Sequence, residues 1–254
     1  MDSGAAGDFD YERHGQGYAR ERRTDPRIAA RVHAALGAAR TVLNVGAGAG
    51  SYEPLDRHVV AVEPSAAMRA QRSRDLAPAV IGRAEQLPFD AGAFDAAMAT
   101  ITIHQWAEPA RGLRELRRVT RGPIVLLSFD GDALDHFWLA TYAPELIAAE
   151  RRRYPALGEI GEWLGGTTQV SVVPIPIDCV DGFTEAFYAR PERLLESAVR
   201  RAQSAWGFVE RGAEQRAVEA LRAALASGDW DRRFGGLRTQ PEFEGSLRLI
   251  VNLP

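Results

Sequence analysis

The sequence predicts an α/β protein with a doubly wound, mainly parallel sheet. Three observations support this prediction: five short apolar runs within the first 130 residues, helix-like segments between them, and a glycine-rich turn at residues 46–50, directly after the first run. Apolar strands that alternate with helices form parallel sheets covered on both faces. Ligands of such sheets bind beyond the carboxyl ends of the strands, so we expect the functional site at the glycine turn and the neighbouring strand ends.

The core elements follow one another in the first half of the chain. Thr24 or Asp25 can cap a helix whose first turn accepts Pro26. The segment 41–50 predicts a buried strand that runs into the glycine turn, and we expect a helix after that turn to present unpaired N–H groups to a polar ligand. The other expected elements are strands at 58–62, 79–82, 94–100 and 124–129, and helices at 65–76 and about 108–119.

The regular alternation stops after residue 129, and the rest of the chain predicts a helical lid. The expected helical segments are 134–165, about 191–206 and about 213–227. A late strand is expected near 170–178, where Pro174 and Pro176 confine it to a sheet edge or an irregular path.

These elements predict three parts of the chain. They are a core at 1–130 with an N-terminal helical segment, a mostly helical lid at 131–242 that includes the late strand, and a final strand at 243–254. The late and final strands would bring the sheet to seven strands.

Composition excludes several classes of protein. All 31 residues counted as lysine or arginine are arginine, so there is no lysine for a Schiff base or a phosphate-binding loop. Cys179 is the only cysteine, which excludes an intramolecular disulfide and a cysteine-cluster metal site. A formal net charge of −3 gives no electrostatic reason to expect nucleic acid or a membrane surface as a partner.

The sequence contains no segment typical of export or membrane insertion. No apolar run approaches the roughly 20 residues needed to span a bilayer. Residues 1–13 are acidic and rich in Gly and Ala, unlike a secretory signal. We therefore expect a cytoplasmic protein without a membrane partner.

Glu63 indicates which kind of ligand the glycine turn binds. It follows the second expected strand, 17 positions after Gly46. Glycine lets a ligand approach the backbone closely, but a Gly-x-Gly-x-Gly turn alone fits several nucleotide folds. A carboxylate at the end of the neighbouring strand can accept hydrogen bonds from both hydroxyls of a ribose. Together the two features predict a ribose-bearing ligand.

Several further segments occur in an order that resembles one family. They are 43–50 (LNVGAGAG), 62–65 (VEPS) with Met68 beyond it, 82–89 (GRAEQLPF) followed by Phe94-Asp95, and 115–119 (ELRRV) before the fifth strand. In this order they resemble the class I S-adenosylmethionine (SAM)-dependent methyltransferases, in particular the small-molecule group that includes ubiquinone/menaquinone-type methyltransferases. The resemblance covers about residues 18–129. It implies a Rossmann-like core that binds SAM, releases S-adenosylhomocysteine (SAH) and uses no metal.

The resemblance also implies which residues contact SAM. Gly46 and Gly48 would lie against its methionyl part, together with Ala47 and Thr100. Glu63 would hold the ribose. The other implied contacts are Pro64 and Met68 beside the adenine, Ala84 and Glu85 at the adenine amino group, and Tyr18 and Arg22 at the methionine carboxylate, with Arg20 and Arg23 as near alternatives to Arg22.

Asn44 departs from the family pattern. Members usually carry Asp or Glu at this position, where a carboxylate helps to hold the cationic amino group of SAM. The amide of Asn44 therefore predicts weaker binding or a contact that has moved elsewhere.

His104 is the expected catalytic residue. It lies in the loop after the fourth strand, where an acceptor should approach, and an imidazole can take a proton from a hydroxyl near neutral pH. The alternative is that His104 packs or contacts SAM.

Aromatic residues of the loop and lid predict the acceptor side of the site. An aromatic-lined cap suits a small, partly apolar acceptor. The alternative is that these side chains form the core of the lid. The expected substrate residues are His104, Trp106, Trp138, Tyr142 and Phe183.

The sequence thus predicts a SAM-dependent methyltransferase that acts on a small, partly apolar organic acceptor, with O-methylation favoured by His104. One alternative is an RNA or protein methyltransferase. The absence of a basic patch and of an Asn/Asp-Pro-Pro-aromatic signature argues against it. The other alternative is a protein that binds SAM or SAH without transferring a methyl group, which Asn44 keeps open.

Overall fold

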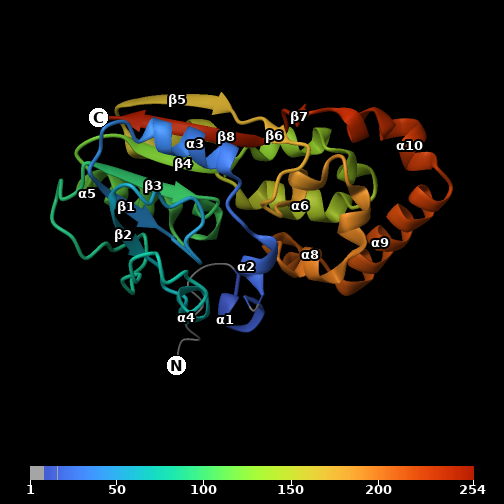
Figure 1. Ribbon diagram of the computed structural model, residues 1–254, viewed down its shortest axis with the longest axis horizontal. Helices are drawn as coiled ribbons and strands as arrows, with labels where there is room; N and C mark the ends of the chain where they lie inside the picture. The colour runs from blue at the N-terminus through green and yellow to red at the C-terminus, as the bar shows by residue number, and fades with distance from the viewer. Residues whose placement is uncertain (1–8, 16) are drawn as a thin grey trace.

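A six-stranded mixed sheet forms the centre of the computed structural model, which describes residues 9–15 and 17–254. The strand order is β2-β1-β3-β4-β8-β5 (Figure 1). β1 to β4 are parallel to one another, whereas β8 runs antiparallel to both of its neighbours. The strands are β1 (Thr41–Val45), β2 (His58–Val62), β3 (Ala96–Thr100), β4 (Ile124–Phe129), β5 (Thr167–Val172) and β8 (Leu247–Leu253). The predicted mainly parallel, doubly wound sheet is confirmed.

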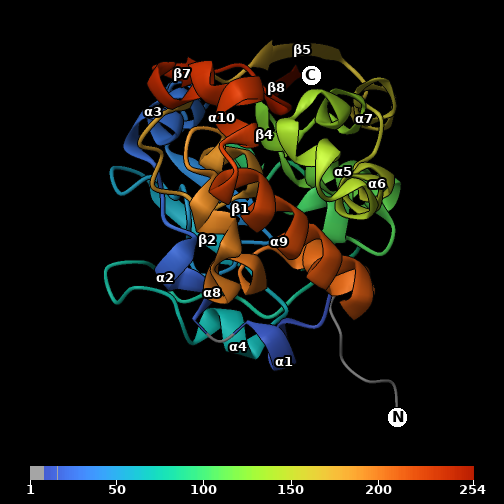
Figure 2. The same ribbon diagram turned by 90° about the vertical axis from the view of Figure 1, so that its right-hand side faces the viewer.

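Successive side chains of each strand point to opposite faces of this sheet, and helices cover both faces. Val42 packs in the cluster that contains residues of α3 (Pro26–Ala35), while Leu43 packs in the cluster of α5 (Pro109–Val119) and α7 (Leu157–Leu164). In Figure 2, α3 lies on one side of the sheet and α5 and α7 lie on the other. A strand covered on both faces must be apolar throughout, and β4 is buried at every position.

A mostly helical region lies beyond the carboxyl ends of β1, β3 and β4 (Figure 1). Buried Trp138 and Trp230 of this region belong to the same hydrophobic cluster as Val42 in the sheet, so the two regions share one core. The α-helices of the region are α6 (Pro144–Arg153), α8 (Ser197–Arg201), α9 (Arg211–Ala226) and α10 (Asp229–Phe234), and β6 (Ile175–Pro176) pairs with β7 (Glu242–Phe243) in a separate sheet. The 3-10 helices of the chain are η1 (Ile103–Gln105), η2 (Gly131–His136), η3 (Trp138–Thr141), η4 (Thr184–Phe187), η5 (Pro191–Leu195), η6 (Ser204–Phe208) and η7 (Gly235–Thr239).

The N-terminal segment packs at the same end of the sheet. It contains α1 (Tyr11–His14) and α2 (Tyr18–Glu21), and α1 lies beside α4 (Ala66–Arg69). The Ser65 hydroxyl donates a 2.8 Å hydrogen bond to Glu12 Oε1, and the Gln71 side chain donates one of 2.8 Å to the carbonyl of Gly15. These polar contacts hold α1 against the segment that follows β2.

The segment 79–82 does not form the expected strand, which leaves six strands in the main sheet. Val80 makes one isolated bridge to Val62 at the outer edge of β2, while Pro78 and Gly82 flank the segment and Ile81 is 71% exposed. Too few residues of this segment can continue the backbone hydrogen bonds with β2. The helix expected at 65–76 is also shorter, because α4 ends at Arg69 and the chain continues in turns.

Two further helical predictions differ from the structure. No helix follows the glycine turn, because the chain from Gly46 to β2 folds in successive turns in which Tyr52 adopts a φ of +65° and is buried. The helix expected at 191–206 is broken into η5, α8 and η6. The breaks allow Leu194 and Val199 both to be buried in the core. In contrast, β5 does form a sheet edge and gives way to an irregular path at the prolines, as predicted.

Glu185 connects the helical region to the main sheet. Both of its carboxyl oxygens accept hydrogen bonds from the N–H of Ser246, at 3.1 and 2.9 Å, and Oε2 accepts a third of 2.8 Å from the Ser246 hydroxyl. Both residues are buried, and burial raises the pKa of the Glu185 carboxyl to about 7. Ser246 directly precedes β8, so this contact fixes where β8 begins.

We predict that Glu185→Ala lowers the free energy of unfolding by about 2–4 kcal/mol, because it leaves two buried donors of Ser246 without a partner. Urea unfolding at pH 4, below the ordinary pKa of 4.5 of this carboxyl, measures the effect with little contribution from its charge, because the group is then mostly protonated in both the folded and the unfolded chain. Exposed Glu244 provides the control, and Glu244→Ala should change stability by no more than about 0.5 kcal/mol. Equal stabilities of the two variants would contradict the anchoring role.

Candidate functional site

The glycine turn after β1 brings the chain close to the loop after β3. Gly46 has a φ of +68°, and a Cβ at this position would lie 2.1 Å from the side-chain oxygen of Thr102. Only glycine avoids both the left-handed strain and the clash. The N–H groups of Gly46 and Ala47 donate to the carbonyl of Val62, which holds the turn against the end of β2. The ends of β1, β2 and β3 therefore meet at one place.

Glu63 directly follows β2 and faces this turn. Its Oε2 accepts a 2.8 Å hydrogen bond from the N–H of Gly48, and its Oε1 accepts one of 2.8 Å from the N–H of Ser65. Burial raises the pKa of the carboxyl above its ordinary value, while the two N–H groups act in the opposite direction. A carboxylate fixed in this way presents its remaining lone pairs in one orientation, which suits hydroxyl donors such as those of a ribose.

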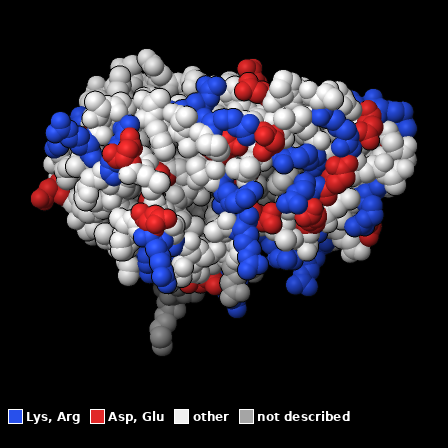
Figure 3. Space-filling view, in the orientation of Figure 1, with Lys and Arg blue, Asp and Glu red and all other residues white. Residues whose placement is uncertain are grey.

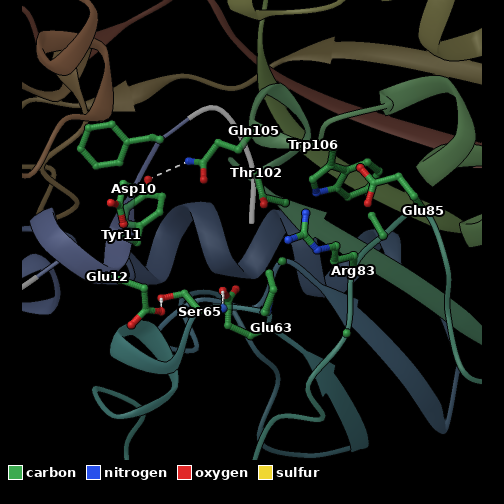
Figure 4. Close-up of a pocket in the computed structure, with 15 residues that line it drawn as sticks. Asp10, Tyr11, Glu12, Glu63, Ser65, Arg83, Glu85, Thr102, Gln105 and Trp106 are labelled. Carbon is green, nitrogen blue, oxygen red and sulfur yellow. Dashed lines mark hydrogen bonds between the residues drawn. The ribbon is translucent and has the colours of Figure 1, made fainter. Parts of the chain in front are cut away.

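Two adjoining cavities open on Gly46 and Glu63. The Trp106 cavity lies between the strand ends, the loop 82–85 and the N-terminal segment 9–12 (Figure 4). The Met68 cavity lies along the glycine turn. The residues predicted to contact SAM line these cavities as follows: Gly46, Glu63, Pro64, Ala84 and Glu85 the Trp106 cavity, and Tyr18, Gly46, Ala47, Gly48, Glu63, Met68 and Thr100 the Met68 cavity.

A third cavity, the Glu150 cavity, lies on the side of the helical region. Tyr11 and Gln105 line all three cavities, and the Gln105 amide donates a 2.7 Å hydrogen bond to the Tyr11 hydroxyl. Ile101 lines the Met68 and Glu150 cavities with a φ of +51°, a strained conformation for a β-branched residue. The three cavities therefore meet at Tyr11 and Gln105, and Ile101 lies between the Met68 and Glu150 cavities.

Asn44 lies beneath the glycine turn and lines none of these three cavities. Its amide donates a 3.0 Å hydrogen bond to Glu53 Oε1, and Glu53 forms a buried 2.9 Å ion pair with Arg72. Burial raises the pKa of the Glu53 carboxyl, although Arg72 and the Asn44 amide lower it. The amide of Asn44 is thus held by a buried carboxylate that is itself paired with Arg72.

Arg22 lines the Glu150 cavity, not the Met68 cavity. Its guanidinium forms a buried ion pair with Asp181, with Nε 2.5 Å from Oδ1, and lies 5.3 Å from the centre of the Tyr18 ring. The Tyr52 hydroxyl donates a 2.7 Å hydrogen bond to the same carboxylate. Asp181 was not singled out in the sequence, because its partners are more than 100 positions away.

His104 lines the Glu150 cavity and is buried. Its Nε2 lies 3.3 Å from the side-chain nitrogen of Gln105, and its Nδ1 has no hydrogen-bond partner among the described residues. Burial and the charges of Arg153 and Arg22 hold the pKa of this imidazole well below its ordinary value. His104 is therefore neutral at pH 7 and a weak base.

The aromatic residues expected at the acceptor side occupy three different places. Phe183 lines the Glu150 cavity with His104, and Trp106 lines the cavity that bears its name. Trp138 and Tyr142 lie side by side in the core of the helical region, where the Trp138 indole donates a 3.0 Å hydrogen bond to the carbonyl of Tyr188. The structure does not bring Trp138 and Tyr142 to any of the three cavities.

The structure adds residues that sequence reasoning missed. Tyr11 and Gln105 are 94 positions apart, so no sequence pattern relates them. Glu150 precedes three arginines in α6 and therefore resembled part of a solvated face, yet only 8% of it is exposed. Burial raises the pKa of its carboxyl to about 7.

Comparison with known proteins identifies the type of domain. Residues 43–123 match the family model described as a methyltransferase domain. A crystal structure described as a candidate methyltransferase from an antibiotic biosynthesis pathway of Anabaena variabilis is 28% identical, with a TM-score of 0.83, and the match covers 91% of this chain and 98% of that one. No curated protein matches the sequence.

Two more distant structures share the fold. A SAM-dependent methyltransferase from Thermotoga maritima is 17% identical, with a TM-score of 0.53 and coverage of 96% and 97% of the two chains. The cyclase SpnF is 16% identical, with a TM-score of 0.52 and coverage of 89% and 79%. Because one of these proteins is described as a cyclase, the fold alone does not establish methyl transfer.

We predict that Asn44→Asp lowers the free energy of unfolding by about 2–4 kcal/mol at pH 8, because it places a second buried carboxylate against Glu53. The folded variant then binds a proton that the unfolded chain releases, so the loss should shrink at pH 5. Urea unfolding at the two pH values measures this difference. The double variant Asn44→Asp/Glu53→Gln should recover part of the stability at pH 8, and a loss that is independent of pH would contradict the like-charge explanation.

Proposed function

We propose that the protein is a SAM-dependent methyltransferase that transfers a methyl group from SAM to a small, partly apolar organic acceptor. The match of residues 43–123 to a methyltransferase domain supports this proposal. The meeting of the three cavities at Tyr11 and Gln105 carries this proposal. The Trp106 and Met68 cavities adjoin at the strand ends, and the Glu150 cavity shares Tyr11, Ile101 and Gln105 with the Met68 cavity. Methyl transfer needs such an arrangement, because the acceptor must face the donor with water excluded.

The residues of the Trp106 and Met68 cavities fit SAM. Gly46 leaves space where any side chain would clash with Thr102, and Glu63 presents an oriented carboxylate to ribose hydroxyls. In this proposal Pro64, Ala84, Glu85 and Trp106 surround the adenine. When bound, SAM supplies an electrophilic methyl group on a sulfonium. The protein contributes alignment and a dry environment.

The proposed acceptor carries a hydroxyl group. A hydroxyl must lose its proton to become a good nucleophile. The sequence favours O-methylation because His104 could accept that proton. The depressed pKa of His104 makes it a poor proton acceptor, although its place on the Glu150 cavity supports contact with the acceptor. Another group of the same cavity therefore has to accept the proton.

A nucleic-acid or protein substrate is less consistent with these features. Arginine and acidic side chains are intermixed over the face shown in Figure 3, and the Glu150 cavity is bounded by buried aromatic residues. Among the described residues, no helix is long and apolar enough to cross a bilayer. A small organic molecule therefore remains the proposed acceptor.

We predict that Glu63→Gln weakens SAM and SAH binding about 10- to 100-fold, because charge-assisted hydrogen bonds to two ribose hydroxyls contribute about 1.5–3 kcal/mol. Isothermal titration calorimetry measures the dissociation constants. Glu219 on α9 is exposed and bonds only Gln215 among the described residues, so Glu219→Gln is the matched control and should bind SAM like the wild type.

Transfer itself is tested with SAM that carries a labelled methyl group. The wild type should move label into small hydroxyl-bearing acceptors, and Glu63→Gln should require more SAM for the same rate. Tight SAM binding without transfer to any acceptor would instead support the alternative of a SAM- or SAH-binding protein. Transfer to RNA or to protein, but not to small molecules, would also contradict the proposal.

A further inference from the structure

Glu150 is a buried carboxyl group whose hydrogen-bond acceptor sites are not all used by other described residues. Among the described residues its hydrogen-bond partner is the Thr184 hydroxyl, 3.2 Å from Oε1, and the same hydroxyl lies 3.2 Å from the Gln203 side-chain oxygen. One hydroxyl proton cannot satisfy both acceptors. Glu185 differs, since all of its hydrogen bonds to Ser246 serve the fold. Glu150 therefore retains acceptor capacity inside the cavity that it lines.

The walls of the Glu150 cavity suit a flat, apolar ring. The Phe129 ring lies 5.4 Å from the Phe183 ring and 5.5 Å from the Tyr154 ring, and Tyr154 packs 4.7 Å from the imidazole of His104. These rings already pack against one another, and the cavity beside them has a volume of about 30 Å³, so a bound ring would have to extend into the adjoining Met68 cavity or displace side chains. The cavity thus combines aromatic walls with one underused carboxyl group.

Charges around the cavity favour an acceptor that develops negative charge. Arg22 of α2 and Arg153 of α6 both lower the pKa of His104 and of Glu150, so their positive potential reaches this space. The charge of Glu185, from η4, acts against them, and Tyr154 remains neutral because burial raises its pKa. Asp181, which pairs with Arg22, also offsets part of this positive charge. A sulfonium bound at the proposed SAM site would add one more positive charge, and together with the two arginines it would stabilise an acceptor oxygen that loses its proton to Glu150.

We propose that the Glu150 cavity binds a phenol-like hydroxyl compound and that the Glu150 carboxylate takes the proton of that hydroxyl during methyl transfer. This inference rests on the proposed methyltransferase function and names its acceptor class and its base. The hydroxyl O–H bond breaks, and the proton moves to Glu150. An oxygen lone pair forms the new O–C bond, while the electron pair of the broken C–S bond stays on sulfur. The products are a methyl ether, neutral SAH and a proton that Glu150 later releases to solvent.

Glu150 also has the right acidity for this step. Burial raises the pKa of its carboxyl to about 7, whereas the imidazole of His104 is a weaker base than usual. A base with a pKa near the working pH combines sufficient ionisation with sufficient strength. The rate should therefore rise with pH through the region near 7 and then level off.

The test compares Glu150→Gln with Glu145→Gln in the whole 254-residue chain, using methyl-labelled SAM with catechol, phenol and benzylamine as acceptors. Glu145 lies on the same helix but is exposed and pairs with Arg216, so its variant receives the same chemical change away from the cavity. We expect phenol methylation by the wild type and by Glu145→Gln. In Glu150→Gln, kcat should fall about 10²- to 10⁴-fold and the rise of rate with pH should disappear. Its SAM dissociation constant should stay within about twofold of the wild type.

Further variants separate base catalysis from a structural role. Glu150→Asp should be faster than Glu150→Gln and should regain an increase of the methylation rate with pH. His104→Asn should keep the increase of rate with pH that the wild type shows. The inference is overturned if only benzylamine is methylated, if Glu150→Gln keeps its rate, or if phenol does not bind the SAH-loaded wild type. SAM binding with no transfer to either acceptor class would overturn the proposed methyltransferase function and this inference together.

Discussion

The buried pair of Arg22 and Asp181 joins the three segments that bound the cavities. Arg22 belongs to the N-terminal segment and Asp181 to the helical region, while Tyr52, from the segment after the glycine turn, donates to the same carboxylate. The Gly182 N–H also donates a 2.9 Å hydrogen bond to the carbonyl of Glu21. A buried ion pair of this kind adds little net stability, but loss of one partner leaves an uncompensated charge that costs about 3–5 kcal/mol. Loss of either charge would therefore disturb the contact at which the three segments meet.

The grouping of residues on the proposed cofactor side could be predicted because its determinants are local in sequence. Strand ends, glycines and Glu63 are read from apolar runs and their last residues, and the neighbouring ends of parallel strands converge on one edge. The structure brings Gly46, Glu63 and Met68 to adjoining cavities for that reason. The same logic gave one strand too many, since Val80 shows the apolar character of a strand but has too few free neighbours to extend one.

The acceptor side could not be predicted in the same way, because its residues come from distant segments. Tyr11, Phe129, Glu150 and Thr184 lie on four different elements, and no spacing relates them. Burial also changes the chemistry of a residue without any sign in the sequence. Burial, together with the charges of Arg153 and Arg22, lowers the pKa of His104 and weakens it as a base. Glu150 precedes three arginines in the sequence, as a solvent-exposed residue would, yet its carboxyl is buried.

Tyr11 lines all three cavities, and Glu12 beside it is bound by Ser65, so the amino-terminal segment forms a shared wall of the whole site. Any ligand of the three cavities therefore contacts this segment, and the hydrogen bonds of Ser65 to Glu12 and of Gln71 to Gly15 help to hold it in place. Under the proposed function, a substitution that loosens these bonds would affect the binding of donor and acceptor together.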